Sequence, residues 1–165
     1  MVLDIEETLI VDSTSIIDAG ARGYRGAAST NQAECPSGVL CSSGKSGGAH
    51  TVQGGDIAGT SGTPYDAITW PTKPGAGGAA GGTVDCRGGD GGGRIKINAR
   101  TVWLDGVLNA DGQDGHAGGG GAGGSILLIS DSLVGQGTIS AVGGLGYGGA
   151  GGGAGGAVAL YCANT

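Results

Sequence analysis

Two stretches of this sequence, residues 117–125 and 148–157, consist almost entirely of glycine and alanine, in a chain with 42 glycines among 165 residues. A helical bundle is excluded, because glycine costs about 1 kcal/mol per helix position relative to alanine. Collagen is excluded because the glycines do not occupy every third position. Polyglycine can form an extended helix with three residues per turn and no internal hydrogen bonds. We therefore expect the tracts to form a layer held by backbone hydrogen bonds rather than by buried side chains.

Large apolar residues are scarce, which limits the core that the chain can form. There are ten leucines, eleven isoleucines and ten valines, but no phenylalanine. Charged residues make up only 13% of the chain, with a net charge of −6, whereas disordered chains usually carry more charge. Fourteen acidic against eight basic residues argue against nucleic-acid binding. No run of about 18 apolar residues predicts a membrane span.

An internal repeat of 31 residues organises the second half of the chain. Residues 94–124 align with residues 125–156, and each unit ends in one of the glycine tracts. A third copy occupies about residues 8–26. The aligned pairs in the two later copies are Ile95/Ile126, Ile97/Leu128, Gly106/Gly137, Leu108/Ile139, Ala110/Ala141 and Gly112/Gly143.

A second signature supports this alignment. The pattern Gly-x-x-Gly-ring-x-Gly occurs once in each copy, with Tyr24, His116 and Tyr147 at the ring position. These residues share a planar ring rather than a chemical group, so we interpret the position as a ring packed against glycine backbone. Residues 1–165 are thus interpreted as a single glycine-rich repeat domain, interrupted by an insertion at residues 27–82.

The ordered part of each unit is predicted to form short strands. In the second copy these are residues 95–97 and 102–104, followed by Asp105-Gly106 and residues 107–110. Asp-Gly between apolar runs is typical of a hairpin, whereas the 31-residue period favours strands stacked in parallel register. We favour the second interpretation: an all-β, repetitive β-solenoid-like domain in which short strands alternate with polyglycine II-type tracts. A meander of hairpins is the alternative.

The insertion at residues 27–82 contains all four prolines and the aromatic residues Tyr65 and Trp70. Loops of this length are usually functional or disordered. Because Tyr65, Ile68 and Trp70 supply apolar anchors, we expect an ordered lobe. If the chain binds a specific ligand, Tyr65 and Trp70 are the candidate contacts; otherwise the two rings only anchor the insertion.

The four cysteines are Cys35, Cys41, Cys86 and Cys162, and no two of them form a Cys-x-x-Cys pair. An even number of cysteines in a weakly charged, glycine-rich chain favours disulfides and an oxidising compartment, and free buried thiols are the alternative. Three pairings are possible. A Cys35–Cys41 bond would pin the insertion, and a Cys86–Cys162 bond would clamp the repeats. No signal peptide is visible, because acidic residues follow Met1.

The second half of the chain resembles the glycine-rich repeat modules of large extracellular and cell-surface proteins. The resemblance lies in three apolar segments with glycine tracts between them: Arg94-Ile-Lys-Ile, Ser125-Ile-Leu-Leu-Ile and Ala157-Val-Ala-Leu-Tyr161. The segment from Tyr65 to Pro71 is similar to one that precedes those repeats. The tracts also resemble the polyglycine sandwich of some phage tail-fibre adhesins. The resemblance covers roughly residues 9–162. It implies a surface location and a structural or adhesive role, without catalytic residues.

Chemical sites are poorly supported by the sequence. His116 with Asp105, Asp111 and Asp114 is the one cluster that suggests metal or acid–base chemistry. The alignment places Gln136 and Val142 opposite Asp105 and Asp111, so the carboxylates do not recur as a calcium-binding repeat requires. The glycines of residues 88–93 lack the Lys-Ser/Thr of a phosphate-binding loop, and the serines lack the context of a Ser-His-Asp enzyme. We expect no enzyme, metal or cofactor.

These observations favour a structural function. We expect a non-enzymatic extracellular subunit of a surface filament, stalk or coat that associates head to tail through its terminal strands, or with other surface proteins. An adhesin or carbohydrate-binding module that uses the insertion to contact glycans is the alternative. Ice binding would need a regular threonine or alanine ladder, and none recurs at the 31-residue period.

Overall fold

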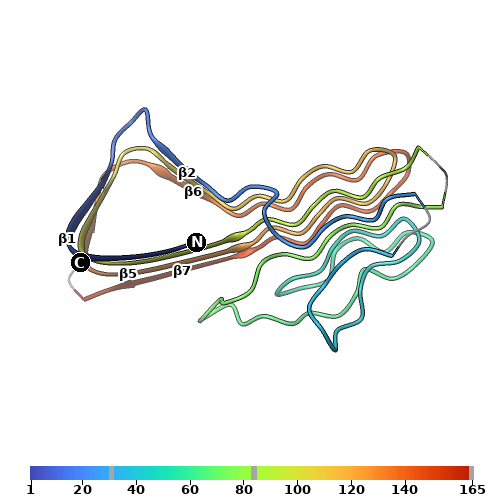
Figure 1. Ribbon diagram of the computed structural model, residues 1–165, viewed down its shortest axis with the longest axis horizontal. Coiled ribbons are helices and arrows are strands. Elements are labelled where there is room, and N and C mark those ends of the chain that lie inside the picture. Colours follow the sequence, from blue (N-terminus) through green and yellow to red (C-terminus); the bar gives the residue numbers. More distant parts are fainter. Residues whose placement is uncertain (30–31, 83–84, 164–165) are drawn as a thin grey trace.

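Seven β-strands form two parallel sheets in the computed structural model, which describes residues 1–29, 32–82 and 85–163. The first sheet has four strands in the order β1-β3-β5-β7, and the second has three in the order β2-β4-β6. Figure 1 shows the two sheets at one end of the molecule and the glycine-rich segments at the other. The described residues contain no helix. The strands are β1 (Val2–Val11), β2 (Ile16–Asp18), β3 (Arg94–Leu104), β4 (Val107–Asn109), β5 (Ser125–Val134), β6 (Thr138–Ser140) and β7 (Ala157–Cys162).

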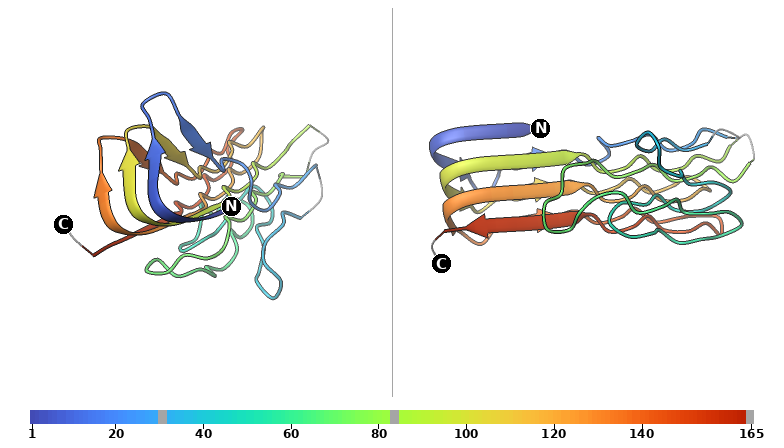
Figure 2. Two further views of the ribbon diagram at one scale, coloured as in Figure 1. Left: turned by 60° about the vertical axis from the view of Figure 1, so that its left-hand side comes forward. Right: turned by 90° about the horizontal axis from the view of Figure 1, so that it is seen from below.

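The register of the strands places the aligned residues side by side. Ile95 pairs with Ile126 across β3 and β5, and Leu108 pairs with Ile139 across β4 and β6. Both pairs are 31 residues apart, which is the spacing of the sequence alignment. Figure 2 shows the strands of the first sheet stacked one above another, with β1 and β7 as the outer strands.

Asp105-Gly106 does not form a hairpin. It turns the chain from β3 in the first sheet into β4 in the second, and both strands pair in parallel with other partners. A Cβ at Gly106 would lie 2.2 Å from the carbonyl oxygen of Ser15, so the close approach of the preceding layer requires glycine here. The alternative of a hairpin meander is therefore wrong.

The apolar core lies between the two sheets. It is built from aliphatic side chains that recur on one face of the stacked strands, so each layer covers the next. Leu108 of β4 closes this core from the second sheet, and Ile17 and Ile139 pack against it from the neighbouring strands. The completely buried members are Ile95, Ile97, Val102, Leu108, Ala110, Ile126 and Leu128.

The glycine tracts are held by backbone hydrogen bonds that follow a three-residue period. In residues 119–124, successive N–H groups donate to three different neighbouring segments in turn, and the cycle then repeats. This is the behaviour of an extended helix with three residues per turn. The acceptors are Ala79 and Ala76 for residues 119 and 122, Gly151 and Ala154 for residues 120 and 123, and Gln113 and Ala110 for residues 121 and 124, at 2.8–3.0 Å.

The carbonyl groups of the same tract face three further neighbours. They accept hydrogen bonds from segments 89–92 and 144–147 and from Gly48 of the insertion. Residues 118–124 are therefore surrounded by six extended segments, which is possible only where no side chain separates the backbones. At Gly121, for example, a Cβ would lie 2.1 Å from the carbonyl oxygen of Asp90. The bonding is of the kind expected from the composition.

The insertion forms an additional row of this layer. Its residues 76–79 accept hydrogen bonds from the tract of residues 118–124, and Gly48 donates to Gly120. Figure 1 shows the insertion alongside the glycine segments, below them in that view. No strand falls within the described part of residues 27–82, and the Cys35–Cys41 disulfide closes a short loop within it.

The predicted fold class, a repetitive β-solenoid-like domain stapled by disulfides, is wrong. The chain forms two distinct parallel sheets, of four and three strands. The two short strands expected at residues 95–97 and 102–104 are one continuous strand, β3. The insertion contributes its own segments to the glycine layer, so the rows of that layer are not equivalent repeats. One disulfide is formed, Cys35–Cys41, and the Cys86–Cys162 clamp, which was one of the possible pairings, is not formed.

Candidate interaction surfaces

The outer strands β1 and β7 each have one edge that is not paired within the first sheet. The two edges differ in character. β7 has the sequence AVALYC, without charge, proline or bulge. β1 contains Asp4, Glu6 and Glu7, and its pairing with β3 shifts register between Ile5 and Thr8. Charges and bulges limit unwanted pairing at a sheet edge, so β7 is the less protected of the two.

The core is open at the β7 end. Val158 pairs with Ile126, and Leu160 pairs with Leu128, so both side chains continue the buried columns of the core. Ile126 and Leu128 are completely buried, whereas Val158 is 41% exposed and Leu160 is 46% exposed. The second sheet stops at β6, one strand earlier. Within the described residues, no strand of the second sheet lies opposite this last pair of core side chains.

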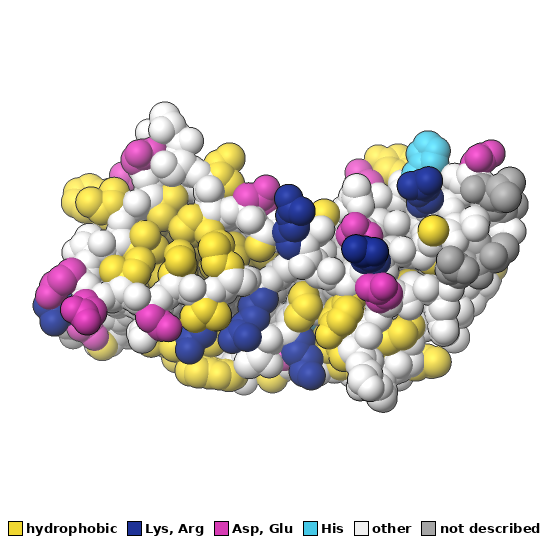
Figure 3. All heavy atoms as spheres, in the orientation of Figure 1, with side chains coloured by type: hydrophobic (Ala, Val, Ile, Leu, Met, Phe, Trp, Pro, Cys, Tyr) yellow, Lys and Arg dark blue, Asp and Glu magenta, His cyan; other side chains and the backbone are white. Residues whose placement is uncertain are grey.

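Hydrophobic side chains also gather between the two sheets in the space-filling view of Figure 3. This view looks along the stack of strands from the β1 end, because it has the orientation of Figure 1, and β7 lies at the far end. The charged side chains of the same region lie around this apolar area. In β3, Arg100 donates from Nη1 to both carboxylate oxygens of Glu7 of the β1 bulge, at 2.9 and 2.8 Å. Both side chains are well exposed, so the pair contributes little to stability.

The predicted contact residues Tyr65 and Trp70 have different environments. The Tyr65 hydroxyl donates to the carbonyl oxygen of Pro74 at 2.6 Å, its ring meets His50 edge to face, and burial raises the pKa of its phenol. It anchors the loop. Trp70 packs against Tyr161 of β7 with ring centroids 5.3 Å apart, and the two side chains remain 49% and 41% exposed.

Tyr161 also borders a surface hollow of about 330 Å³. Its hydroxyl donates to the carbonyl oxygen of Thr69, which fixes the ring against the insertion. Register places Tyr161 beside Ile129 and Ile129 beside Asn98, so one row across the sheet supplies much of the lining. Asp131 adds a carboxylate to it. Tyr161 was not among the candidate residues, because only the fold brings it to Trp70.

A buried polar cluster joins the insertion to the start of β5. The Nε2 atom of His50 lies 2.9 Å from the carbonyl oxygen of Lys73, 3.3 Å from Ser125 Oγ and 3.3 Å from Asp66 Oδ2. Ser125 Oγ lies 2.6 Å from the Lys73 carbonyl oxygen and 3.1 Å from Asp66 Oδ2. His50 and Ser125 are completely buried. The sequence contains no local signal for this cluster, since its members are up to 75 residues apart.

These three residue types do not form a hydrolase triad. In a Ser-His-Asp triad the serine and the carboxylate bind opposite ring nitrogens, whereas here both contact Nε2 of His50. The other ring nitrogen, Nδ1, is buried without a hydrogen-bond partner. Ser125 is inaccessible to a substrate. The arrangement therefore serves to attach one segment to another.

The three ring positions lie in the glycine-rich region. Tyr24 is half-buried, whereas His116 and Tyr147 are exposed. His116 exchanges two backbone hydrogen bonds with Arg87, each of 2.8 Å. Its side chain borders a hollow of about 350 Å³ with Asp90 and Asp114.

The aspartates of the same region bind backbone of the next layer. Asp105 accepts from the N–H of Gln136, Asp111 from that of Val142, and Asp114 from that of Leu145. Each pair is 31 residues apart, so each carboxylate serves the residue aligned with it. These are structural contacts. Within the described residues, no group of three or more His, Cys, Asp or Glu side chains could hold a metal ion.

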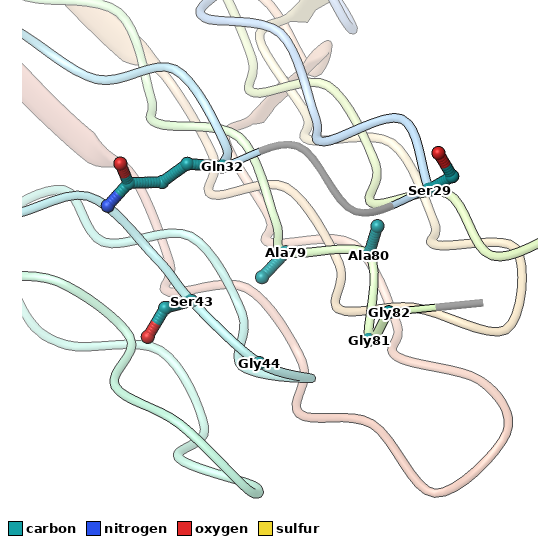
Figure 4. Close-up of a pocket in the computed structure, with 8 residues that line it drawn as sticks. All are labelled: Ser29, Gln32, Ser43, Gly44, Ala79, Ala80, Gly81 and Gly82. Carbon is teal, nitrogen blue, oxygen red and sulfur yellow. The ribbon is translucent and has the colours of Figure 1, made fainter. Parts of the chain in front are cut away.

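The remaining candidates are the two cysteines outside the disulfide and one further surface hollow. Cys86 is buried with Ala27, Ala33 and Ala80, whereas Cys162 lies at the end of β7 and contacts Ser130 Oγ at 3.7 Å. The hollow in Figure 4, of about 360 Å³, is lined by glycine, alanine, Ser29, Gln32 and Ser43, none of which is ionisable.

No helix in the described part of the chain is long and apolar enough to cross a membrane. Comparison of the sequence and structure with protein-family models, curated proteins and solved structures finds no match.

Proposed function

We propose that the protein is a non-enzymatic extracellular structural protein, a subunit of a surface filament, stalk or coat that assembles head to tail through its terminal strands. The observation that carries this proposal is the open core at β7, where Val158 and Leu160 continue the buried columns but stay exposed. The Cys35–Cys41 disulfide supports an oxidising, extracellular setting.

The two ends of the first sheet are compatible with each other. All of its strands are parallel, so β1 of one copy can add to β7 of another in the direction already used inside the sheet. Leu3 pairs with Ile97 within the chain, and in the contact it would meet Leu160, which ends the same column of paired residues. β7 contains no charge, so Asp4, Glu6 and Glu7 of the incoming strand meet no like charge there. A head-to-tail contact of this kind generates an open filament.

The test compares two double variants by negative-stain electron microscopy and sedimentation velocity at micromolar concentration. Val158→Lys/Leu160→Lys places two charges on the exposed end of the core. Val142→Lys/Leu145→Lys is the matched control, because these side chains are 62% and 59% exposed and lie outside the strands. We expect filaments from the unmodified chain and the control, and monomers from the first variant. Monomers from the unmodified chain, or unchanged filaments from the first variant, would exclude the proposal.

A second candidate function, a carbohydrate-binding module, is supported by the half-exposed pair of Trp70 and Tyr161 beside a hollow that contains Asn98 and Asp131. Flat aromatic faces and nearby polar groups suit the apolar and hydroxyl faces of a sugar. On a glycan array, Trp70→Ala should abolish binding. Trp103→Ala, which removes another half-exposed tryptophan, should leave it unchanged. Equal binding by both variants would exclude this site.

A further inference from the structure

The loop of residues 64–73 is attached to the first sheet at two places. At one, Asp66 and the Lys73 carbonyl oxygen bind Ser125 at the first residue of β5. At the other, the Thr69 carbonyl oxygen binds Tyr161. His50 lies at the first attachment and contacts Ser125, Asp66 and Lys73 through a single ring nitrogen. The state of this ring therefore affects the attachment directly.

The geometry fits a neutral ring. Nε2 carries the proton and donates to the Lys73 carbonyl oxygen at 2.9 Å, while Nδ1 keeps its lone pair. Ser125 Oγ then donates its proton to Lys73 or Asp66. Asp66 is already satisfied by the N–H groups of Thr72 and Lys73, both at 2.9 Å. Every strong donor in the cluster has an acceptor in this state.

Protonation would place a second N–H on Nδ1, which is buried and has no partner. A buried, unpaired charged donor is strongly destabilising. The ionisable groups that contact the ring are the Asp66 carboxylate, 3.3 Å from Nε2, and the Tyr65 phenol ring, 5.6 Å between centroids. Both belong to the insertion, and Ser125 is the contact from β5. Burial lowers the pKa of His50, and the opposing effects of the Lys73 carbonyl and Asp66 do not cancel it.

We propose that His50 is an acid-sensitive latch, which holds the 64–73 loop on β5 while its ring is neutral and releases the loop when the ring is protonated. Release separates Trp70 from Tyr161 of β7, because Trp70 is part of the loop. The open form binds the proton with the ordinary affinity of histidine. The opening equilibrium therefore rises by up to about tenfold per pH unit below pH ~6.5. The latch does not depend on the proposed function.

The test follows Trp70 fluorescence and amide hydrogen exchange of residues 64–73 between neutral and mildly acidic pH, with exchange corrected for its intrinsic pH dependence. Trp103→Phe leaves Trp70 as the sole tryptophan. In this background, His50→Gln removes the latch residue. His116→Gln is the matched control, because it removes the only other histidine, which is exposed.

We expect acid to increase exchange of the loop at least tenfold in the Trp103→Phe protein and in the His116→Gln control, with β3 and β5 unchanged. The His50→Gln variant should show no such increase in loop exchange at acid pH. The unmodified chain gives a second measurement, since the His50 ring proton resonance should titrate at the midpoint of loop opening. An identical acid step without His50, the absence of any step, or His50 protonation with the loop still closed would each overturn the latch.

Discussion

At the scale of single residues, the missing Cβ of glycine permits the close packing of the tracts. Carbonyl oxygens of neighbouring segments occupy the space where side chains would begin, as at Gly121, where Asp90 O lies 2.1 Å from an added Cβ. Alanine fits only at selected positions, such as the completely buried Ala122. The identity of each position in a tract is therefore constrained, although the sequence of the tract looks monotonous.

The substitution Gly121→Ala should destabilise the protein by about 2 kcal/mol or more, because an added methyl group in a packed interior forces backbone apart. Gly155→Ala is the matched control, since a Cβ at Gly155 meets nothing within 4 Å. Denaturant unfolding of the two variants measures the difference. Equal stability of the two alanine variants would show that the six-neighbour packing around residues 118–124 is incorrect.

A second prediction at this scale concerns Asp66 and the fall of the free energy of unfolding at acid pH. Burial acts to raise the pKa of this carboxyl, but hydrogen bonds from the N–H groups of Lys73 and Thr72 outweigh it and bring the pKa below its ordinary value of 3.8. The ionised form is thus favoured in the folded state. Its contribution to the free energy of unfolding is complete above pH ~3.8 and is lost as the pH falls further.

Asp66→Asn should therefore lower stability at neutral pH by about 1–3 kcal/mol and should flatten the fall in stability below pH ~4. Asp4→Asn makes the same change of charge on the exposed surface of β1 and should do neither. The measurement is denaturant unfolding from pH 7 down to acid pH. If the stability of the Asp66→Asn variant fell as steeply below pH ~4 as that of the unmodified protein, the lowered pKa of Asp66 would be contradicted.

Some residue roles could be predicted from the sequence and others could not. The 31-residue alignment placed Asp105 opposite Gln136 and Asp111 opposite Val142, and these carboxylates bind those residues' N–H groups. Because Gln136 and Val142 carry no carboxylate, the alignment argued against a recurring set of calcium ligands at these aspartates. His50 gave no such signal, because its partners Asp66 and Ser125 are brought to it only by the path of the insertion.

At the scale of elements, the apolar periodicity located the strands but not their lengths. β3 runs without a break from Arg94 to Leu104 because neither glycine nor proline interrupts it, whereas two short strands were expected. The hairpin signal of Asp105-Gly106 failed since β3 and β4 pair in parallel with their aligned neighbours β5 and β6 rather than with each other. Tertiary pairing thus decides the outcome where local turn chemistry is ambiguous.

The glycine tract also gives an element-level prediction. Residues 119–124 are outside any strand, but each of their N–H groups donates to a neighbouring segment. We expect their amide exchange to be slowed by a factor on the order of 10⁴, as for the buried strand β5, because opening one tract breaks bonds to several others. Hydrogen exchange measured by NMR tests this, with the exposed Gly149 as a fast-exchanging reference. Exchange of the tract as fast as that of Gly149 would show that the layer is not ordered in solution.

At the scale of the whole molecule, the expectation of a β-solenoid-like domain failed. A repeat period specifies that equivalent strands stack, but it does not specify how the strands are divided between sheets. The layers stack in parallel as the period requires, yet their strands divide into two sheets that end at different layers, at β6 and β7. The 27–82 insertion then adds segments to the glycine layer that no repeat predicts. Its ordered state followed from its aromatic anchors, while its docking position depended on contacts distant in sequence, such as Thr69 with Tyr161.

If the proposed assembly is correct, a subunit that has lost its β7 contact should terminate a filament, because the two ends of the molecule make different contacts. The Val158→Lys/Leu160→Lys variant keeps an intact β1 end, so it can add to the β7 end of a filament but offers no further site. Each filament accepts at most one such subunit in a head-to-tail arrangement. When the variant makes up about a tenth of the subunits, the mean length should therefore fall to about ten subunits. Electron microscopy of co-assembled mixtures measures this length. A symmetric contact between two β7 edges would instead exclude the variant and leave the filament length unchanged.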